Sequence, residues 1–153
     1  MSAYKTFLLV EDDPFDASFV RHEFEAAAAN TTLRLVRDVA EAQSYVRGEG
    51  FYADRTQYPM PDVILLDLRT PRMNGIEFLQ WLRMHAPVSD RQIPVVALIC
   101  SKVHETIIEE VYKRGANAHL FKPLTWENLR TELQTLGGDR PNIRAGRTTF
   151  ADG

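Results

Sequence analysis

The sequence predicts a doubly wound α/β domain built around a five-stranded parallel sheet. The first observation is a set of short apolar runs without polar alternation, which is typical of strands buried on both faces. The second is the set of longer segments between these runs, in which apolar residues recur at helical spacing. Because consecutive parallel strands are joined by right-handed crossovers, this alternation places helices on both faces of one sheet.

Five apolar runs are the expected strands. The run at 63–66 is the strongest, and the run at 33–36 is the weakest in apolar character. Each run is short enough for a strand and too short for a typical helix. The expected strands are Phe7–Val10, Leu33–Val36, Val63–Leu66, Val95–Ile99 and Ala118–Phe121.

Five amphipathic segments are the expected helices. Asp13 before Pro14 predicts the start of the first helix, and Thr125 is the expected N-cap at the start of the last. Gly48 and Gly115 are expected to end the second and fourth helices, at about 39–46 and 103–114, and the third is expected at 74–85. The expected apolar stripes are Val20, Phe24 and Ala27; Ile76, Leu79 and Leu82; Val103, Ile107 and Val111; and Trp126, Leu129, Leu133 and Leu136.

Length and composition indicate one globular domain. The chain has 153 residues, of which 44% are hydrophobic and 25% are charged, and this suits a single core. We expect the domain to occupy residues 1–136, and residues 137–153 to form a flexible C-terminal tail. The segment 49–61 has two prolines and no clear period, so it is expected to be a long loop before the third strand.

Charge and the lack of targeting signals argue against several functional classes. The chain has 18 basic and 21 acidic residues and a net charge of −3, which does not favour nucleic-acid binding. Cys100 is the only cysteine, so no internal disulfide is expected. No apolar run approaches the ~20 residues that span a bilayer, and residues 1–5 do not begin a signal peptide. We therefore expect a cytoplasmic protein that binds neither nucleic acid nor membranes.

Acidic residues follow the ends of two expected strands. Glu11 and Asp12 come directly after the first strand, and Asp67 follows the third. Sites in doubly wound domains lie beyond the carboxyl ends of the strands, where these side chains would meet. Three carboxylates in one crevice repel each other unless a cation compensates, and an all-oxygen ligand set suits Mg²⁺. Lys122, after the fifth strand, would balance charge in the same crevice.

Four segments at these positions together resemble bacterial response-regulator receiver domains. The segments are Leu8–Pro14, Asp62–Gly75, Ile93–Val96 and Gly115–Pro123, and the resemblance covers about residues 5–136. It implies a flavodoxin-like (βα)5 fold with strand order 2-1-3-4-5. The acidic start and the long loop before the third strand look most like the stand-alone receivers that partner bacterial phytochromes.

The resemblance assigns phosphoryl chemistry to two residues. Asp67 matches the phosphoacceptor, and Lys122 matches the lysine that contacts the phosphoryl group. The implied donor is a sensor histidine kinase, of phytochrome type, or a phosphotransfer protein. The peptide bond before Pro123 is expected to be cis by analogy, and a homodimer is left open.

The resemblance also assigns a Mg²⁺ site. Glu11, Asp12 and Asp67 match the side-chain ligands, and the backbone carbonyl of Arg69 matches a further ligand. This agrees with the physics of phosphoryl transfer, which needs positioning and neutralisation of charge more than covalent chemistry.

The sequence departs from the family pattern at the switch positions. The family usually has Thr or Ser at the end of the fourth strand, and this position falls on Ile99 or Cys100, neither of which carries a hydroxyl. Ser101 is the nearest hydroxyl, and His119 stands at the usual aromatic position. A lost hydrogen bond to a charged acceptor is worth about 1.5–3 kcal/mol. We therefore expect phosphorylation with atypical switching.

Two other functions compete with this interpretation. The first is a pseudo-receiver, a phosphorylation-independent interaction module, which Ile99 favours and the retained acids oppose. The second is a phosphatase with Asp67 as nucleophile, but such enzymes typically need an acid two residues later, where this chain has Arg69. The leading interpretation is a single-domain response regulator that is not an enzyme and that signals by protein contact.

Overall fold

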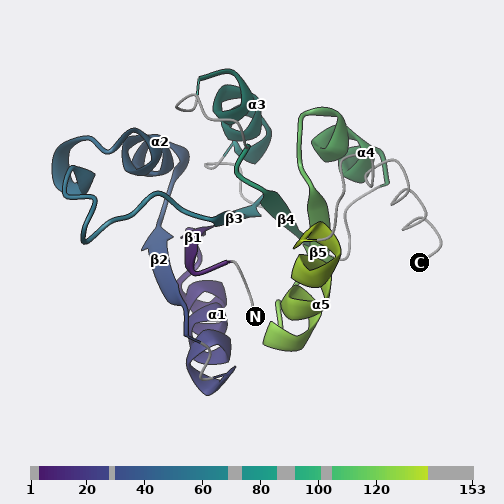
Figure 1. The fold of residues 1–153 in the computed structure, drawn as a ribbon. Helices are drawn as coiled ribbons and strands as arrows, with labels where there is room; N and C mark the ends of the chain where they lie inside the picture. The colour runs from purple at the N-terminus through teal and green to yellow at the C-terminus, as the bar shows by residue number, and fades with distance from the viewer. Residues whose placement is uncertain (1–3, 28–29, 69–73, 86–91, 101–104, 138–153) are drawn as a thin grey trace.

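The molecule is a five-stranded parallel sheet with helices on both faces (Figure 1). The structure is a computed structural model, and it describes residues 4–27, 30–68, 74–85, 92–100 and 105–137. The strand order is β2-β1-β3-β4-β5, and each neighbouring pair is parallel. Both the predicted fold class and the predicted strand order are confirmed.

The elements lie within a few residues of their predicted positions. The strands are β1 Thr6–Val10, β2 Thr32–Val36, β3 Val63–Asp67, β4 Val95–Ile99 and β5 Ala118–Phe121. The helices are α1 Pro14–Ala27, α2 Val39–Arg47, α3 Gly75–His85, α4 Glu105–Lys113 and α5 Trp126–Gly137, with a 3-10 turn η1 at Gly50–Tyr52. None of the helices in the described ranges is long and apolar enough to cross a bilayer.

Each strand supplies side chains to two separate cores. In β1, Leu8 and Val10 pack with α2, α3 and α4, whereas Phe7 and Leu9 pack with α1 and α5. This follows from the strand period of two, which points successive side chains to opposite faces. Figure 1 shows the same division, with α1 and α5 on one side of the sheet and the other helices opposite. Both faces of the sheet are thus covered, which explains the uninterrupted apolar runs.

Side-chain caps define the helix ends. Asp13 Oδ1 accepts from the Phe15 N–H at 2.9 Å, and Thr125 Oγ1 accepts from the Asn128 N–H at 3.2 Å. Gly48 ends α2 with φ of 70°, a left-handed conformation that favours glycine. The predicted caps at these three places are confirmed.

The predicted apolar stripe of α4 is wrong at one position. Ile107 is 37% exposed, whereas Ile108 and Val111 are buried against the sheet. The two buried residues are three positions apart and therefore lie on the same face of α4, which packs against the sheet. Ile107 lies about 100° away from Ile108 around the helix axis and so falls outside this face. Val103 lies outside the described residues.

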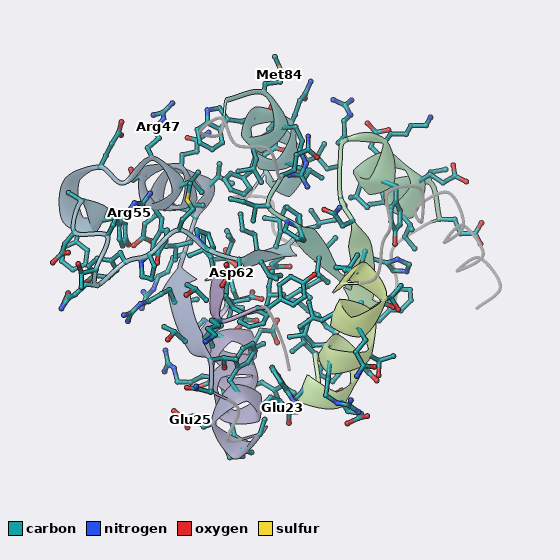
Figure 2. The ribbon with its side chains drawn as sticks, viewed as in Figure 1. Glu23, Glu25, Arg47, Arg55, Asp62 and Met84 are labelled. Carbon is teal, nitrogen blue, oxygen red and sulfur yellow. The ribbon has the colours of Figure 1, made fainter. Side chains whose placement is uncertain are left out.

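The segment 49–61 is more structured than the predicted loop. It contains η1, and the Tyr52 and Tyr58 rings pack edge to face at 5.2 Å. The Arg55 guanidinium, labelled in Figure 2, donates to the carbonyls of Val46 at 2.7 Å and Tyr58 at 2.8 Å. Aromatic packing and the hydrogen bonds of Arg55 therefore hold a segment whose sequence shows no clear period of apolar residues. The limit at residue 136 stays a prediction, because residues 138–153 lie outside the described ranges.

One arginine ties α3 to the β4–β5 side of the sheet. Arg83 donates to the carbonyl of Gly115 at 2.8 Å, to the carbonyl of Ile93 at 2.8 Å and to Asn117 Oδ1 at 2.8 Å. Burial lowers the pKa of Arg83 to about 10. The guanidinium fork satisfies several part-buried acceptors at once, a task for which its geometry is suited.

We predict that Arg83→Met lowers the free energy of unfolding by about 2–4 kcal/mol, because these acceptors lose a charged donor. Chemical denaturation would measure this loss. Arg130→Met, on an exposed part of α5, removes the same charge and should change stability by about 0.5 kcal/mol or less. Equal effects of the two substitutions would contradict the structural role of Arg83.

Candidate functional site

Three carboxylates meet at the carboxyl edge of the sheet. Glu11 and Asp12 follow β1, and Asp67 ends β3. These strands are paired neighbours, with Val10 opposite Leu66, so the residues that follow are brought together. One oxygen from each of the three acids lies within 4.8 Å of the others. Glu11 and Asp67 are both almost fully buried.

The Lys122 ammonium lies among these acids. Its Nζ is 2.9 Å from Glu11 Oε1, 2.8 Å from Asp16 Oδ2 and 3.1 Å from Asp67 Oδ1. The backbone N–H of Lys122 donates to the backbone carbonyl of Ile99 at 2.9 Å. This hydrogen bond fixes the point at which the Lys122 side chain leaves the sheet. The Lys122–Pro123 peptide bond is cis, as predicted.

Burial and charge act in opposite directions on the two central groups. Burial disfavours the charged form of Lys122, but hydrogen bonds to Asp16 and Glu11 and the nearby negative charges raise its pKa above the ordinary value. Burial, with the hydrogen bond and charge of Asp67, raises the pKa of Glu11 to about 8, although Lys122 acts against this shift. Burial and the neighbouring Asp67 therefore outweigh the effect of Lys122 on Glu11.

The donor set fits a hard divalent cation. Among the residues that the structure describes, Glu11, Asp12 and Asp67 form the one cluster of acids, histidines or cysteines close enough to share an ion. All three offer carboxylate oxygens, which Mg²⁺ and Mn²⁺ prefer. Three clustered carboxyl groups beside one ammonium give such a cation an electrostatic reason to bind here.

Comparison with known proteins identifies the family. The family model of the response regulator receiver domain matches residues 7–134. The chain belongs to the response-regulator receiver family.

Relatives of this receiver include regulators linked to phytochromes. Response regulator Rcp1 of Synechocystis sp. is 30% identical over 130 residues, covering 85% of this chain and 84% of Rcp1. The solved structure of the bacteriophytochrome response regulator AtBRR superposes with a TM-score of 0.73 at 33% identity, covering 90% of this chain and 96% of that one. The phosphorylated cyanobacterial phytochrome response regulator RcpA gives a TM-score of 0.67 at 30% identity, covering 88% and 91%.

The sequence analysis missed one residue of the site. Asp16 lies in the first turn of α1, where an acid is commonly explained by the helix dipole, and the structure pairs it with Lys122. Asp16 follows Glu11 and Asp12 by only five and four positions in the sequence, and this closeness was the available signal. Arg69, the predicted carbonyl ligand, lies outside the described residues.

The predicted switch positions of the receiver differ in their surroundings. Ile99 ends β4 and is 1% exposed within the core that faces α2, α3 and α4. Cys100 follows the strand and is partly exposed, with a free thiol. The His119 ring packs edge to face on Phe121, and its Nδ1 is 2.9 Å from the Tyr112 hydroxyl of α4. His119 is thus tied to α4.

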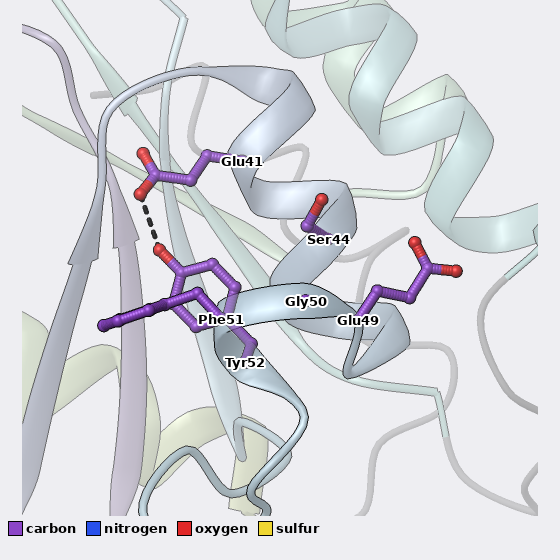
Figure 3. Close-up of a pocket in the computed structure, with 6 residues that line it drawn as sticks. All are labelled: Glu41, Ser44, Glu49, Gly50, Phe51 and Tyr52. Carbon is purple, nitrogen blue, oxygen red and sulfur yellow. Dashed lines mark hydrogen bonds between the residues drawn. The ribbon is translucent and has the colours of Figure 1, made fainter.

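One hollow of the receiver lies away from these acids. It has a volume of about 590 Å³, lies between α2 and η1, and includes none of the carboxylates described above. Its Glu41 already accepts a hydrogen bond from the Tyr52 hydroxyl at 2.5 Å (Figure 3). The clustered acids with their lysine lie at the carboxyl edge of the sheet and not in this hollow. The hollow is lined by Glu41, Ser44, Glu49, Gly50, Phe51 and Tyr52.

We predict that Glu11 makes the metal-free receiver less stable as the pH rises. In the unfolded chain Glu11 loses its proton near pH 4.5, whereas in the folded site it keeps the proton up to about pH 8. Between these values the folded state binds more protons, so the free energy of unfolding falls with rising pH. This contribution is complete below pH 4.5 and is lost as the pH passes 8.

Melting temperatures from pH 5 to 8.5, measured in a chelator, would test this prediction. Wild type should lose stability with rising pH relative to Glu11→Gln, which cannot ionise. The contributions of titratable groups elsewhere in the chain to the pH dependence cancel when the two proteins are compared. Parallel curves for wild type and variant would show that Glu11 does not carry the pH dependence.

Proposed function

We propose that this receiver accepts a phosphoryl group on Asp67 in a two-component phosphorelay. The observation that carries the proposal is a buried carboxylate at the carboxyl edge of the sheet, 3.1 Å from an ammonium and close to two further acids. Lys122 and the acids thus provide the positioning and the charge that phosphoryl transfer requires. The relative RcpA, solved in a phosphorylated form, supports the same assignment.

In the proposed transfer, a carboxylate oxygen of Asp67 attacks the phosphorus of a phosphohistidine. The phosphorus–nitrogen bond breaks, its electron pair stays on the imidazole nitrogen, and the ring, protonated on its other nitrogen, leaves as neutral imidazole. The product is an acyl phosphate on Asp67. The Lys122 ammonium donates to a phosphoryl oxygen and offsets the added negative charge.

We propose that Mg²⁺ is held by Glu11, Asp12 and Asp67, with the Arg69 carbonyl as a further ligand. A bound divalent cation supplies neutralisation of the phosphoryl oxygens. The acidic cluster fits this role, and the relative Rcp1 has been solved in a Mn²⁺-bound form, with 29% identity and a TM-score of 0.63, over 85% of this chain and 89% of that one.

The proposed donor is a histidine kinase of phytochrome type. The likeness to AtBRR and RcpA supports this choice. Phe15 and Phe19 of α1 are 84% and 41% exposed, and they line a hollow of about 240 Å³ together with Asp16 and Lys122. Exposed apolar side chains next to a charged site are typical of protein-interaction surfaces. We propose that the kinase covers these two rings when it presents its phosphohistidine.

We propose that the receiver switches atypically because Ile99 replaces the usual hydroxyl. Ile99 is the last residue of β4, and its backbone carbonyl accepts a hydrogen bond from the backbone N–H of Lys122. Ile99 is therefore the residue of β4 that is closest in register to the lysine. Its side chain cannot donate to a phosphoryl oxygen. The same observation favours the alternative, a pseudo-receiver that binds partners without phosphate.

We predict one phosphoryl adduct when the receiver is incubated with Mg²⁺ and acetyl phosphate. Intact mass would show an added mass of ~80 Da, the mass of one HPO₃ group, in wild type and in a control, Asp54→Ala, whose carboxylate lies in the 49–61 segment. Asp67→Ala should show none. Absence of the adduct in wild type, despite measurable Mg²⁺ binding, would favour the pseudo-receiver.

We predict that Ile99→Thr prolongs the phosphorylated state, because a hydroxyl at this position can donate to the phosphoryl group. The hydrogen bond is worth about 1.5–3 kcal/mol, so a lifetime increase of about 10- to 100-fold is expected. Ile99→Val, which shortens the side chain without adding a donor, is the control. Equal lifetimes in the two variants would disprove the role given to this position.

A further inference from the structure

We propose that Asp16 is a positioning residue, whose carboxylate competes with the phosphoryl group on Asp67 for the Lys122 ammonium. This inference rests on the proposed function, since it concerns the lifetime of the phosphorylated state. Asp16 reaches Lys122 from the first turn of α1, outside the cluster that could hold a metal ion. Its effect on the phosphoryl group is exerted through the position of Lys122.

The Asp16 contact is the shortest that Lys122 makes with an acid. The distance from Nζ is 2.8 Å to Asp16, 2.9 Å to Glu11 and 3.1 Å to Asp67. An ammonium group has three N–H donors and no acceptor. Lys122 Nζ donates hydrogen bonds to Glu11 and Asp16 and forms an ion pair with Asp67, so these two hydrogen bonds hold two of its donors on Glu11 and Asp16.

A phosphoryl group on Asp67 adds several acceptor oxygens, and Lys122 can turn a second donor to them only by leaving Glu11 or Asp16. The Glu11 side chain is fully buried, and water cannot replace the ammonium there. The Asp16 side chain is 35% exposed, so water can replace Lys122 on its carboxylate. Since an acid with access to water loses less when its partner leaves, Asp16 is the partner that Lys122 gives up.

The competition has a direction. While Lys122 stays hydrogen-bonded to Asp16, it stabilises the phosphoryl group on Asp67 less. The Asp16 carboxylate also keeps its negative charge near the negative charge of the phosphoryl group. Removing the charge of Asp16 should therefore leave Lys122 to the phosphoryl group and lengthen the phosphorylated lifetime. A purely structural role, such as compensation of the helix dipole by Asp16, predicts lower stability and no longer lifetime.

The test is the decay rate of the Asp67 adduct in Asp16→Asn, which keeps the shape of the side chain and removes its charge. After removal of acetyl phosphate, intact mass in Mg²⁺ should show a lifetime about two- to fivefold longer than in wild type. Asp16→Glu, which keeps the charge, should return the lifetime toward that of wild type. Glu25→Gln removes an exposed acid from the same helix, labelled in Figure 2, and should leave the lifetime unchanged.

A double-substitution cycle tests whether Asp16 acts through Lys122. In a Lys122→Met background, Asp16→Asn should no longer lengthen the lifetime, because the group for which it competes is gone. An effect that persists without Lys122, or an Asp16→Asn lifetime equal to or shorter than that of wild type, would overturn the role of Asp16. Failure of wild type itself to form an adduct would instead overturn the proposed function, and the inference with it.

Discussion

The candidate site depends on one ammonium group held among three carboxylates. Lys122 bridges Glu11, Asp16 and Asp67, which come from the end of β1, from α1 and from the end of β3. Two of these acids are almost fully buried, and buried charges without partners are strongly destabilising. The raised pKa of Glu11 shows that burial and the neighbouring Asp67 outweigh the effect of Lys122 on this carboxyl group. Three clustered carboxyl groups beside one ammonium favour a divalent cation.

The fold explains why these groups meet. Parallel pairing of β1 with β3 brings their carboxyl ends together, and β5 delivers Lys122 from the far side of β4 to the same edge. Two apolar cores, one on each face, keep the strands in this register. The order of the strands, rather than the distance along the chain, therefore determines which charges interact.

Much of this arrangement was predictable because it follows from strong local patterns. Uninterrupted apolar runs identified the strands, and acids directly after two of them indicated Asp67 and its neighbours. Asp16 escaped prediction because it lies in a helix and not at a strand end, and an acid at a helix start has a simpler explanation. The stripe of α4 was misassigned at Ile107, because the phase of a short helix is decided by packing against the sheet and not by its own spacing.

The central claim is that Asp67 receives the phosphoryl group, and reductive trapping measures this most directly. Borohydride converts an aspartyl phosphate to homoserine, so peptide mass spectrometry of the protein treated with Mg²⁺ and acetyl phosphate reports the modified position. The account predicts homoserine at position 67 and no reduced side chain at Glu11, Asp12 or Asp16. Trapping at Glu11, Asp12 or Asp16 in place of Asp67, or no trapping while Mg²⁺ is bound, would contradict it.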